Sequence, residues 1–253
     1  MSLLICPRDN WKNPVKVNQA DITLLQTVAS SLGLIFNHDK AQDKVYLDKD
    51  VRGVPAPTPE IDTSKKIYLP TTYYSQRDSQ VVISGQNQAR RTCFSSSMAM
   101  AVKAMNPGAL SDSPNADDEY VRHLFSMGAS TDTVNPYDQV ACLKHFGIVG
   151  NYSQKMTWDM IDAELDHGFR VGIGWLCWGP LSNMVEGGHW SLIIGRTSDR
   201  KNYIVHDPFG EADLVSGTYV SSNGSARHYS RINLEKRWRP YGSLGWGMRF
   251  RKD

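Results

Sequence analysis

The strongest pattern along the chain is a stripe of apolar positions spaced as one face of an α-helix. The stripe consists of Met98, Ala101, Val102 and Met105. Thr92 precedes it as a candidate N-cap, and an Asn-Pro-Gly sequence at residues 106–108 follows it as a stop signal. The pattern therefore predicts a helix over residues 93–105, with Cys93 in its first turn.

Downstream of this helix, the pattern stays helical and then changes to the alternation of β-strands. Helices are predicted at residues 119–127, at residues 136–146, after Thr157 and near residues 233–238. Strands are predicted at residues 170–177, 189–194, 202–207 and 246–250. Helices followed by successive strands indicate an α+β fold.

The first residues form a separate pattern. Residues 1–51 predict a small α+β module, with a helix at 19–32 and β-like runs at 34–36 and 44–47. Three prolines within five residues mark residues 52–66 as a linker, so the main domain is expected at 67–253. The module either packs on the main domain or acts as a small binding module.

Composition narrows the functional classes. The chain has 253 residues, a formal net charge of +2 and 40% hydrophobic residues, which is typical of a globular protein and does not indicate nucleic-acid binding. The four cysteines lie far apart with no Cys-x-x-Cys motif, so free thiols are expected rather than a zinc ribbon or a disulfide framework. No metal site or other cofactor is indicated. No apolar run reaches the length of a signal peptide or a membrane span, which predicts a cytoplasmic location.

Cys93 is the candidate nucleophile because free N–H groups and the helix dipole favour a thiolate at a helix start. A thiol nucleophile needs a base, and His189 is the candidate because it opens a strand after Gly187-Gly188. Asp207 lies 18 residues later (207 − 189), where two antiparallel strands would bring its carboxylate beside the imidazole. The three residues thus predict a Cys-His-Asp triad.

An oxyanion would need two hydrogen-bond donors. The backbone N–H of Cys93 is one candidate, and a side-chain amide would be the second. Four amides compete, namely Gln76, Gln86, Asn87 and Gln88. Gln76 lies in the extended segment that enters the domain, whereas the other three lie in a polar loop.

Four motifs resemble those of papain-like cysteine peptidases, more closely the bacteriocin-leader-processing (C39-like) type and its relatives in phages and bacteria. The motifs are YYSQRDS at 73–79, RTCFSSSMAM at 91–100, GGHW at 187–190 and VHDPFG at 205–210. The resemblance implies a papain-like fold, with the nucleophile on a central helix packed on an antiparallel sheet. It also implies Cys93 as nucleophile, His189 as base, Asp207 as orienting acid and Gln76 as oxyanion donor. One departure is the 17-residue gap (93 − 76), which is longer than in the leader peptidases and keeps Gln86 and Gln88 open.

The expected activity is hydrolysis of amide bonds in peptidoglycan peptides by a monomer, as in a phage-type endolysin. Trp178 and Trp190 are expected to contact the substrate. A basic C-terminal stretch over residues 227–252 is either a solvated face or an attraction for anionic cell-wall polymer. Alternatives are a protein-processing or effector peptidase, a catalytically silent wall-binding module and an acyltransferase that uses the same triad.

Overall fold

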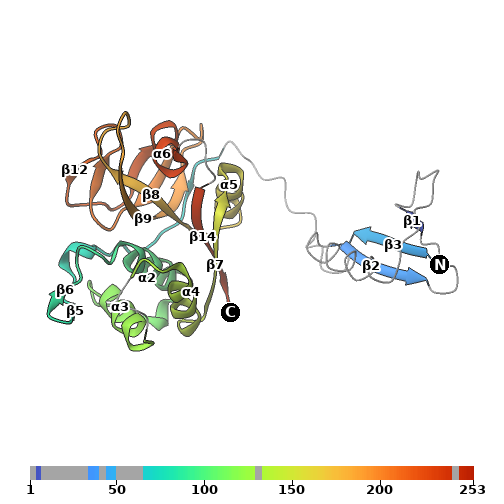
Figure 1. Ribbon diagram of the computed structural model, residues 1–253, viewed down its shortest axis with the longest axis horizontal. Helices are drawn as coiled ribbons and strands as arrows, with labels where there is room; N and C mark the ends of the chain where they lie inside the picture. Colours follow the sequence, from blue (N-terminus) through green and yellow to red (C-terminus); the bar gives the residue numbers. More distant parts are fainter. Residues whose placement is uncertain (1–3, 7–33, 40–43, 50–64, 129–132, 241–244) are drawn as a thin grey trace. The chain divides into compact units, whose positions relative to one another are not determined.

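The computed structural model describes residues 4–6, 34–39, 44–49, 65–128, 133–240 and 245–253 (Figure 1). The chain divides into two compact units, Met1–Ile61 and Asp62–Asp253. The division falls within the proline-rich segment 52–66, most of which lies outside the described residues. Each unit is considered by itself.

Three strands of the first unit are described: β1 (Leu4–Cys6), β2 (Leu34–Asp39) and β3 (Lys44–Lys49). They form a sheet in the order β1-β3-β2, in which β1 is parallel and β2 antiparallel to β3. The two predicted β-like runs are therefore strands. The helix predicted at residues 19–32 lies outside the described residues.

A seven-stranded antiparallel sheet organises the second unit. Its strands are β4 (Ile67–Tyr68), β7 (Ile148–Met156), β8 (Val171–Trp178), β9 (Val185–Arg196), β10 (Asn202–His206), β13 (Arg227–Ser230) and β14 (Gly245–Lys252). Six strands follow the order β13-β10-β9-β8-β14-β7, and β4 adds to β9. Two small hairpins extend from the unit, one of β5 (Val82–Ile83) with β6 (Gln86–Asn87), the other of β11 (Glu211–Asp213) with β12 (Thr218–Ser221).

Helices pack on both faces of this sheet. The helices are α2 (Cys93–Met105), α3 (Asp117–Ser126), α4 (Pro136–His145), α5 (Trp158–Asp166) and α6 (Arg231–Trp238), with short 3-10 turns η1 (Gln76–Asp78) and η2 (Pro107–Ala109). Figure 1 shows α2, α3 and α4 gathered in one half of the unit, with α5 and α6 beside the strands of the other half. The arrangement confirms the predicted α+β class, with the Cys93 helix packed on an antiparallel sheet.

Two hydrophobic cores lie on opposite sides of the sheet. Trp190, Leu192 and Ile194 of β9 pack in the core that contains α2, whereas Ile193 packs in the core that contains α5 and α6. This alternation follows from the two-residue period of a strand. Every residue from Cys93 to Val102 of α2 is buried, so the predicted single stripe is only part of its packed surface.

In the second unit, the predicted helices and the four predicted strands are confirmed, with ends shifted by a few residues. Thr157 caps α5 as expected, because its hydroxyl accepts the Met160 N–H at 3.3 Å. The expectation for Thr92 is wrong in one respect. It precedes α2, but its side chain makes no capping hydrogen bond. Strands β7, β11, β12 and β13 were not predicted, because their alternation is weak or they span only three or four residues.

Candidate active site

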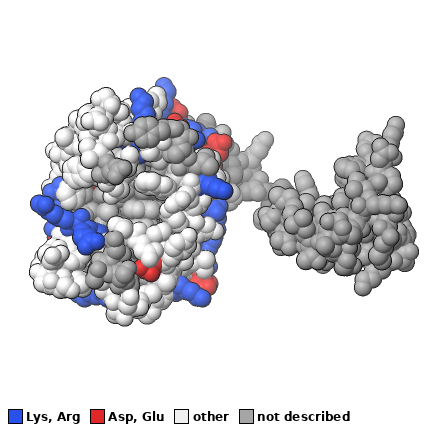
Figure 2. Space-filling view, in the orientation of Figure 1, with Lys and Arg blue, Asp and Glu red and all other residues white. Residues whose placement is uncertain are grey.

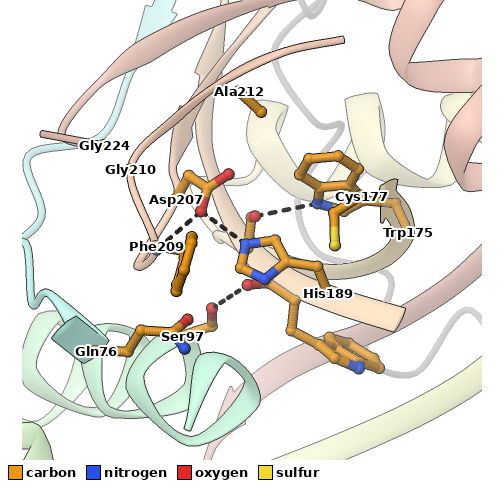
Figure 3. Close-up of polar contacts among 12 residues, drawn as sticks. Gln76, Ser97, Trp175, Cys177, His189, Asp207, Phe209, Gly210, Ala212 and Gly224 are labelled. Atoms are coloured by element: carbon orange, nitrogen blue, oxygen red, sulfur yellow. Dashed lines mark hydrogen bonds and ion pairs between the residues drawn. The ribbon is translucent and has the colours of Figure 1, made fainter. Parts of the chain in front are cut away.

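Adjacent antiparallel strands bring the candidate base and acid together. In the β9–β10 pair, His206 lies opposite Leu192, which places the following Asp207 beside the start of β9. Nε2 of His189 lies 2.6 Å from Oδ1 of Asp207 (Figure 3). This is the pairing that the spacing of the two residues predicted.

Asp207 is fixed by more than its contact with His189. Its Oδ1 also accepts the Phe209 N–H at 3.0 Å, and its Oδ2 accepts the Tyr229 hydroxyl at 2.9 Å. Its backbone is bound on both sides, since its N–H donates to Gly224 and its carbonyl accepts the Tyr73 hydroxyl. The residue is completely buried. A buried carboxylate with three side-chain hydrogen bonds is a rigid acceptor for the imidazole.

His189 lies between Asp207 and Cys93. Its Nε2 donates to Oδ1 of Asp207 at 2.6 Å. Burial by itself disfavours the imidazolium, but the charge and hydrogen bond of Asp207, together with the interaction with Cys93, outweigh it and raise the pKa of His189 to about 10. The edge of the Trp175 ring, 5.3 Å away between centroids, helps to cover the imidazole. The surroundings therefore favour a protonated histidine next to the candidate nucleophile.

Packing of α2 against β9 positions Cys93. The Ser97 hydroxyl donates to the Trp190 carbonyl at 3.1 Å, and the Phe94 ring stacks on the Trp190 ring at 3.6 Å. Cys93 is the first residue of the helix and 8% exposed. Because the first N–H groups of a helix lack intrahelical acceptors, the Cys93 N–H is a free donor beside the thiol.

Gln76 is bound to both segments that surround the site. Its N–H donates to the Pro208 carbonyl at 2.9 Å, next to Asp207, and its side-chain Nε2 donates to the Ala89 carbonyl at 2.8 Å. The side chain is 1% exposed. One amide hydrogen is used by Ala89, which leaves the second available as a donor.

The competing amides are placed differently. Gln86 and Asn87 are exposed in β6, and both ends of the Asn87 amide bind backbone groups of its own loop. Gln88 is buried, and its Nε2 donates to the Gln86 carbonyl at 2.8 Å. Of the four residues, Gln76 is the one that is hydrogen-bonded to the loop that carries Asp207.

The two predicted substrate-contact tryptophans lie in different surroundings. Trp178 is 44% exposed and meets the edges of Phe209 and Tyr219 near the site. Trp190 is 8% exposed, and its ring face is covered by Phe94. Trp178 is therefore available to a substrate, whereas Trp190 belongs mainly to the core.

Three tyrosines at the site were not singled out from the sequence. Tyr73 and Tyr229 bind Asp207, and Tyr219 of β12 lies with its ring 6.0 Å from that of His189. The Tyr219 hydroxyl is buried and has no hydrogen-bond partner. Tyr73 lies in a quoted motif, but the other two belong to strands that were not predicted, so no local signal identified them.

Cys142 and Cys177 differ chemically from a nucleophile. Cys93, Cys142 and Cys177 are free thiols, as expected. Burial raises the pKa of Cys142 and of Cys177 to about 12, so both remain protonated at neutral pH. Of these three thiols, Cys93 is the one that contributes to the raised pKa of His189.

Neither a cluster of metal ligands nor a membrane-spanning helix is present among the described residues. They contain no group of three or more histidine, cysteine or acidic side chains arranged to bind a metal ion. The helices in this part of the chain are all too short or too polar to cross a bilayer.

No protein-family model matches the chain, and no curated protein matches it. Solved structures with a similar fold exist. One described as a C39-like peptidase from Bacillus anthracis has 14% identity and a TM-score of 0.46, over 75% of this chain and 98% of that one. A double glycine motif protease from an AMS/PCAT transporter, solved with its leader peptide, has 12% identity and a TM-score of 0.41, over 72% and 98%. Xylellain, a cysteine protease from Xylella fastidiosa, has 14% identity and a TM-score of 0.38, over 81% and 93%. At these identities the similarity concerns the fold.

Proposed function

We propose that this chain is a cysteine peptidase that hydrolyses amide bonds with Cys93 as nucleophile, His189 as acid and base, and Asp207 as the group that orients the imidazole. The observation that carries the proposal is the buried position of His189, whose Nε2 donates to Oδ1 of Asp207 at 2.6 Å and whose pKa is raised by Asp207 and by Cys93. A catalytic thiol needs a base at hydrogen-bonding distance and a fixed partner for that base.

The geometry suggests the following steps. The Cys93 thiolate attacks the carbonyl carbon, and the resulting oxyanion accepts hydrogen bonds from the Cys93 N–H and from Nε2 of Gln76. The His189 imidazolium gives its proton to the leaving amine as the C–N bond breaks, which leaves an acyl-thioester on Cys93. Water then attacks the thioester while His189 accepts its proton, and the thiolate is released. Asp207 keeps the imidazole in one orientation throughout.

The proposed substrates are peptidoglycan peptides, cleaved as a phage-type endolysin would cleave them. This choice is supported by the resemblance of the four motifs to phage-borne relatives and by the separate compact unit Met1–Ile61, which we propose as a wall-binding part. Trp178 is proposed as a substrate contact because its ring is exposed beside Tyr219 and Phe209.

The test compares the wild type with Cys93→Ala on two substrates, isolated peptidoglycan and a denatured protein. Mass spectrometry of the products would detect new amines and carboxyl groups. Cleavage of peptidoglycan that requires Cys93 is expected. Cleavage of the protein alone would favour a protein-processing peptidase, and the absence of any Cys93-dependent product would overturn the peptidase proposal.

A second measurement tests the nucleophile without a substrate. At mildly acidic pH, iodoacetamide is expected to label Cys93 faster than Cys142 and Cys177, because burial raises the pKa of both other thiols. Equal labelling of the three would contradict the assignment.

A further inference from the structure

A pocket of about 390 Å³ lies beside the proposed catalytic residues. It is lined by Arg77, Asn87, Ala89, Arg90 and Phe209. Figure 2 shows basic side chains gathered at one edge of the second unit, over the segment between β4 and α2 that carries β5 and β6. The volume is sufficient for one or two residues of a peptide.

Two residues that line the pocket are hydrogen-bonded to proposed catalytic residues. The Ala89 carbonyl accepts Nε2 of Gln76, and the Phe209 N–H donates to Oδ1 of Asp207. Ala89 and Phe209 are thus each joined by a hydrogen bond to a proposed catalytic side chain. A group in the pocket would belong to the part of a substrate close to the scissile bond.

Arg77 is held in place at this pocket. Its Nε donates to the Phe209 carbonyl, and its guanidinium carbon lies 3.9 Å from the centre of the Phe209 ring. Stacking on an aromatic ring orients the guanidinium and leaves its two terminal nitrogens for other acceptors. Arg90 is exposed at the same pocket. Neither arginine forms a salt bridge with an acidic side chain among the described residues.

The basic residues of the C-terminal stretch are bound differently. Arg237 is fully buried and donates to the carbonyls of Leu214, Leu176 and Gly179. Arg227, Arg239 and Arg251 pair with Glu211, Glu235 and Glu164, respectively. Much of the positive charge in this stretch is therefore used within the fold, whereas the charge of the pocket is available to a ligand.

We propose that the pocket lined by Arg77 and Arg90 binds a carboxylate of the substrate, either a chain end or an acidic side chain, and so makes the enzyme selective for peptides with free carboxylates near the cleaved bond. The inference rests on the proposed peptidase function. A guanidinium with two free nitrogens matches the two oxygens of a carboxylate, and a second positive charge strengthens the attraction. The ring of Phe209 provides an apolar wall for the carbon atoms that carry the carboxylate.

The test uses two peptide mixtures, fragments of isolated peptidoglycan and a digest of a denatured protein. Each mixture is divided, and the carboxylates of one half are converted to amides. Competition between the two halves, followed by mass spectrometry, gives the ratio of kcat/KM for the acid and the amide. The wild type is expected to prefer the acid about tenfold, and added salt is expected to reduce the preference.

Substitutions of Arg77 and Arg90 test whether the preference for the acid arises in the pocket. Arg90→Gln removes an exposed side chain that forms no hydrogen bond or ion pair with the described residues, so it is expected to lower the preference severalfold without loss of folding. Arg77→Lys keeps the charge and is expected to retain part of the preference, and the double variant Arg77→Gln with Arg90→Gln is expected to abolish it. Lys144→Gln in α4 removes one exposed charge elsewhere and serves as the matched control.

The outcomes separate the two proposals. Equal hydrolysis of acid and amide by the wild type, or an unchanged preference in the double variant, would overturn the carboxylate site and leave the peptidase proposal intact. If neither mixture shows Cys93-dependent hydrolysis, the peptidase proposal fails. Retention of the acid and amide mixtures on immobilised Cys93→Ala protein then tests whether the pocket binds carboxylates. Stronger retention of the acids supports it, and equal retention overturns it.

Discussion

Asp207 and the segment that leads into α2 differ in how their polar groups are satisfied. On the sheet side, both carboxylate oxygens and both backbone groups of Asp207 have hydrogen-bond partners. On the side of the segment that leads into α2, several buried polar atoms have none. These atoms are the Tyr74 hydroxyl, Oε1 of Gln76, Oε1 of Gln88 and the Thr92 hydroxyl.

This difference follows from the tasks that the two sides would perform. A base must keep one orientation through every step, so its acceptor gains from being fixed before a substrate arrives. The opposite side would receive the substrate in the proposed mechanism. Under the proposed function, the sheet side is therefore the rigid half of the site, and residues 74–92, which include Gln76, form the opposite half.

The largest expected effect comes from neutralising the rigid half. Asp207→Asn keeps the shape of the side chain but removes the charge that raises the pKa of His189. Because a raised histidine pKa keeps the imidazolium up to higher pH, activity in the wild type should be lost only as the pH rises towards about 10. In the variant we expect a fall in kcat of roughly 10³-fold and an alkaline limit at lower pH.

The pH profile of kcat/KM measures this change. Asp159→Asn, at an exposed carboxylate in α5, is the matched control and should leave the profile unchanged. An alkaline limit that is identical in wild type and Asp207→Asn would contradict the role of Asp207.

The next largest effect tests Gln76, in the half of the site formed by residues 74–92. Gln76→Ala removes a proposed oxyanion donor, so kcat should fall roughly 10²-fold while KM changes little. Gln88→Ala removes a buried amide from the same segment and is the matched control. A greater loss of kcat in Gln88→Ala than in Gln76→Ala would transfer the role to Gln88.

A smaller effect concerns the stability of the contact between α2 and α3. Oδ2 of Asp117 accepts the Ser96 hydroxyl of α2 at 2.6 Å, and burial, with Asp118 and Asp78 nearby, raises the pKa of Asp117 to about 7. The folded protein then binds a proton that the unfolded chain has released, so the free energy of unfolding falls as the pH rises from about 4 to 7. Asp117→Asn should remove about 2 kcal/mol of this decrease between pH 5 and 7.

Urea unfolding at a series of pH values measures this slope. The wild type should lose stability over the window, and Asp117→Asn should have a flatter profile. The same slope in both proteins would show that the Asp117 carboxyl is ionised throughout.

The smallest effect tests whether Asp207 stays in place when one of its hydrogen bonds is removed. Tyr229→Phe removes one of the hydrogen bonds to Asp207 and also the acceptor of the Ala212 N–H. The bonds of Asp207 to His189 and Phe209 remain, so kcat should fall only severalfold, and the free energy of unfolding should fall by about 1–2 kcal/mol. Steady-state rates and thermal unfolding measure the two effects. A loss of kcat as large as that of Asp207→Asn would show that the tyrosine has a larger role.

Much of the site was predictable because its signals are local. The helix at Cys93 follows from a stripe with a stop sequence, and the strand at His189 follows from a glycine pair before an apolar run. Asp207 could be placed beside His189 because successive antiparallel strands are normally neighbours. The four motifs in order added the papain-like arrangement.

Residues that act through distant contacts were not predictable in the same way. Tyr229 reaches Asp207 from β13, a four-residue strand whose register is set by its pairing with β10. Trp190 was expected to contact a substrate, but alternation along β9 turns its ring toward Phe94 and the core. The sequence alone does not show which side chains of a strand will face a core and be buried by helices.

The sequence by itself determined the α+β class, the helix that begins at Cys93, and the candidate triad of Cys93, His189 and Asp207. Tertiary structure decided which glutamine binds the loop of Asp207. It also decided which arginines are bound within the fold and which remain available to a ligand. Arg77 and Phe209 are 132 residues apart in the chain and meet only after folding. The physical reason is that periodicity and turn residues act over a few neighbours, whereas salt bridges, burial and hydrogen-bond partners depend on which distant segments pack together.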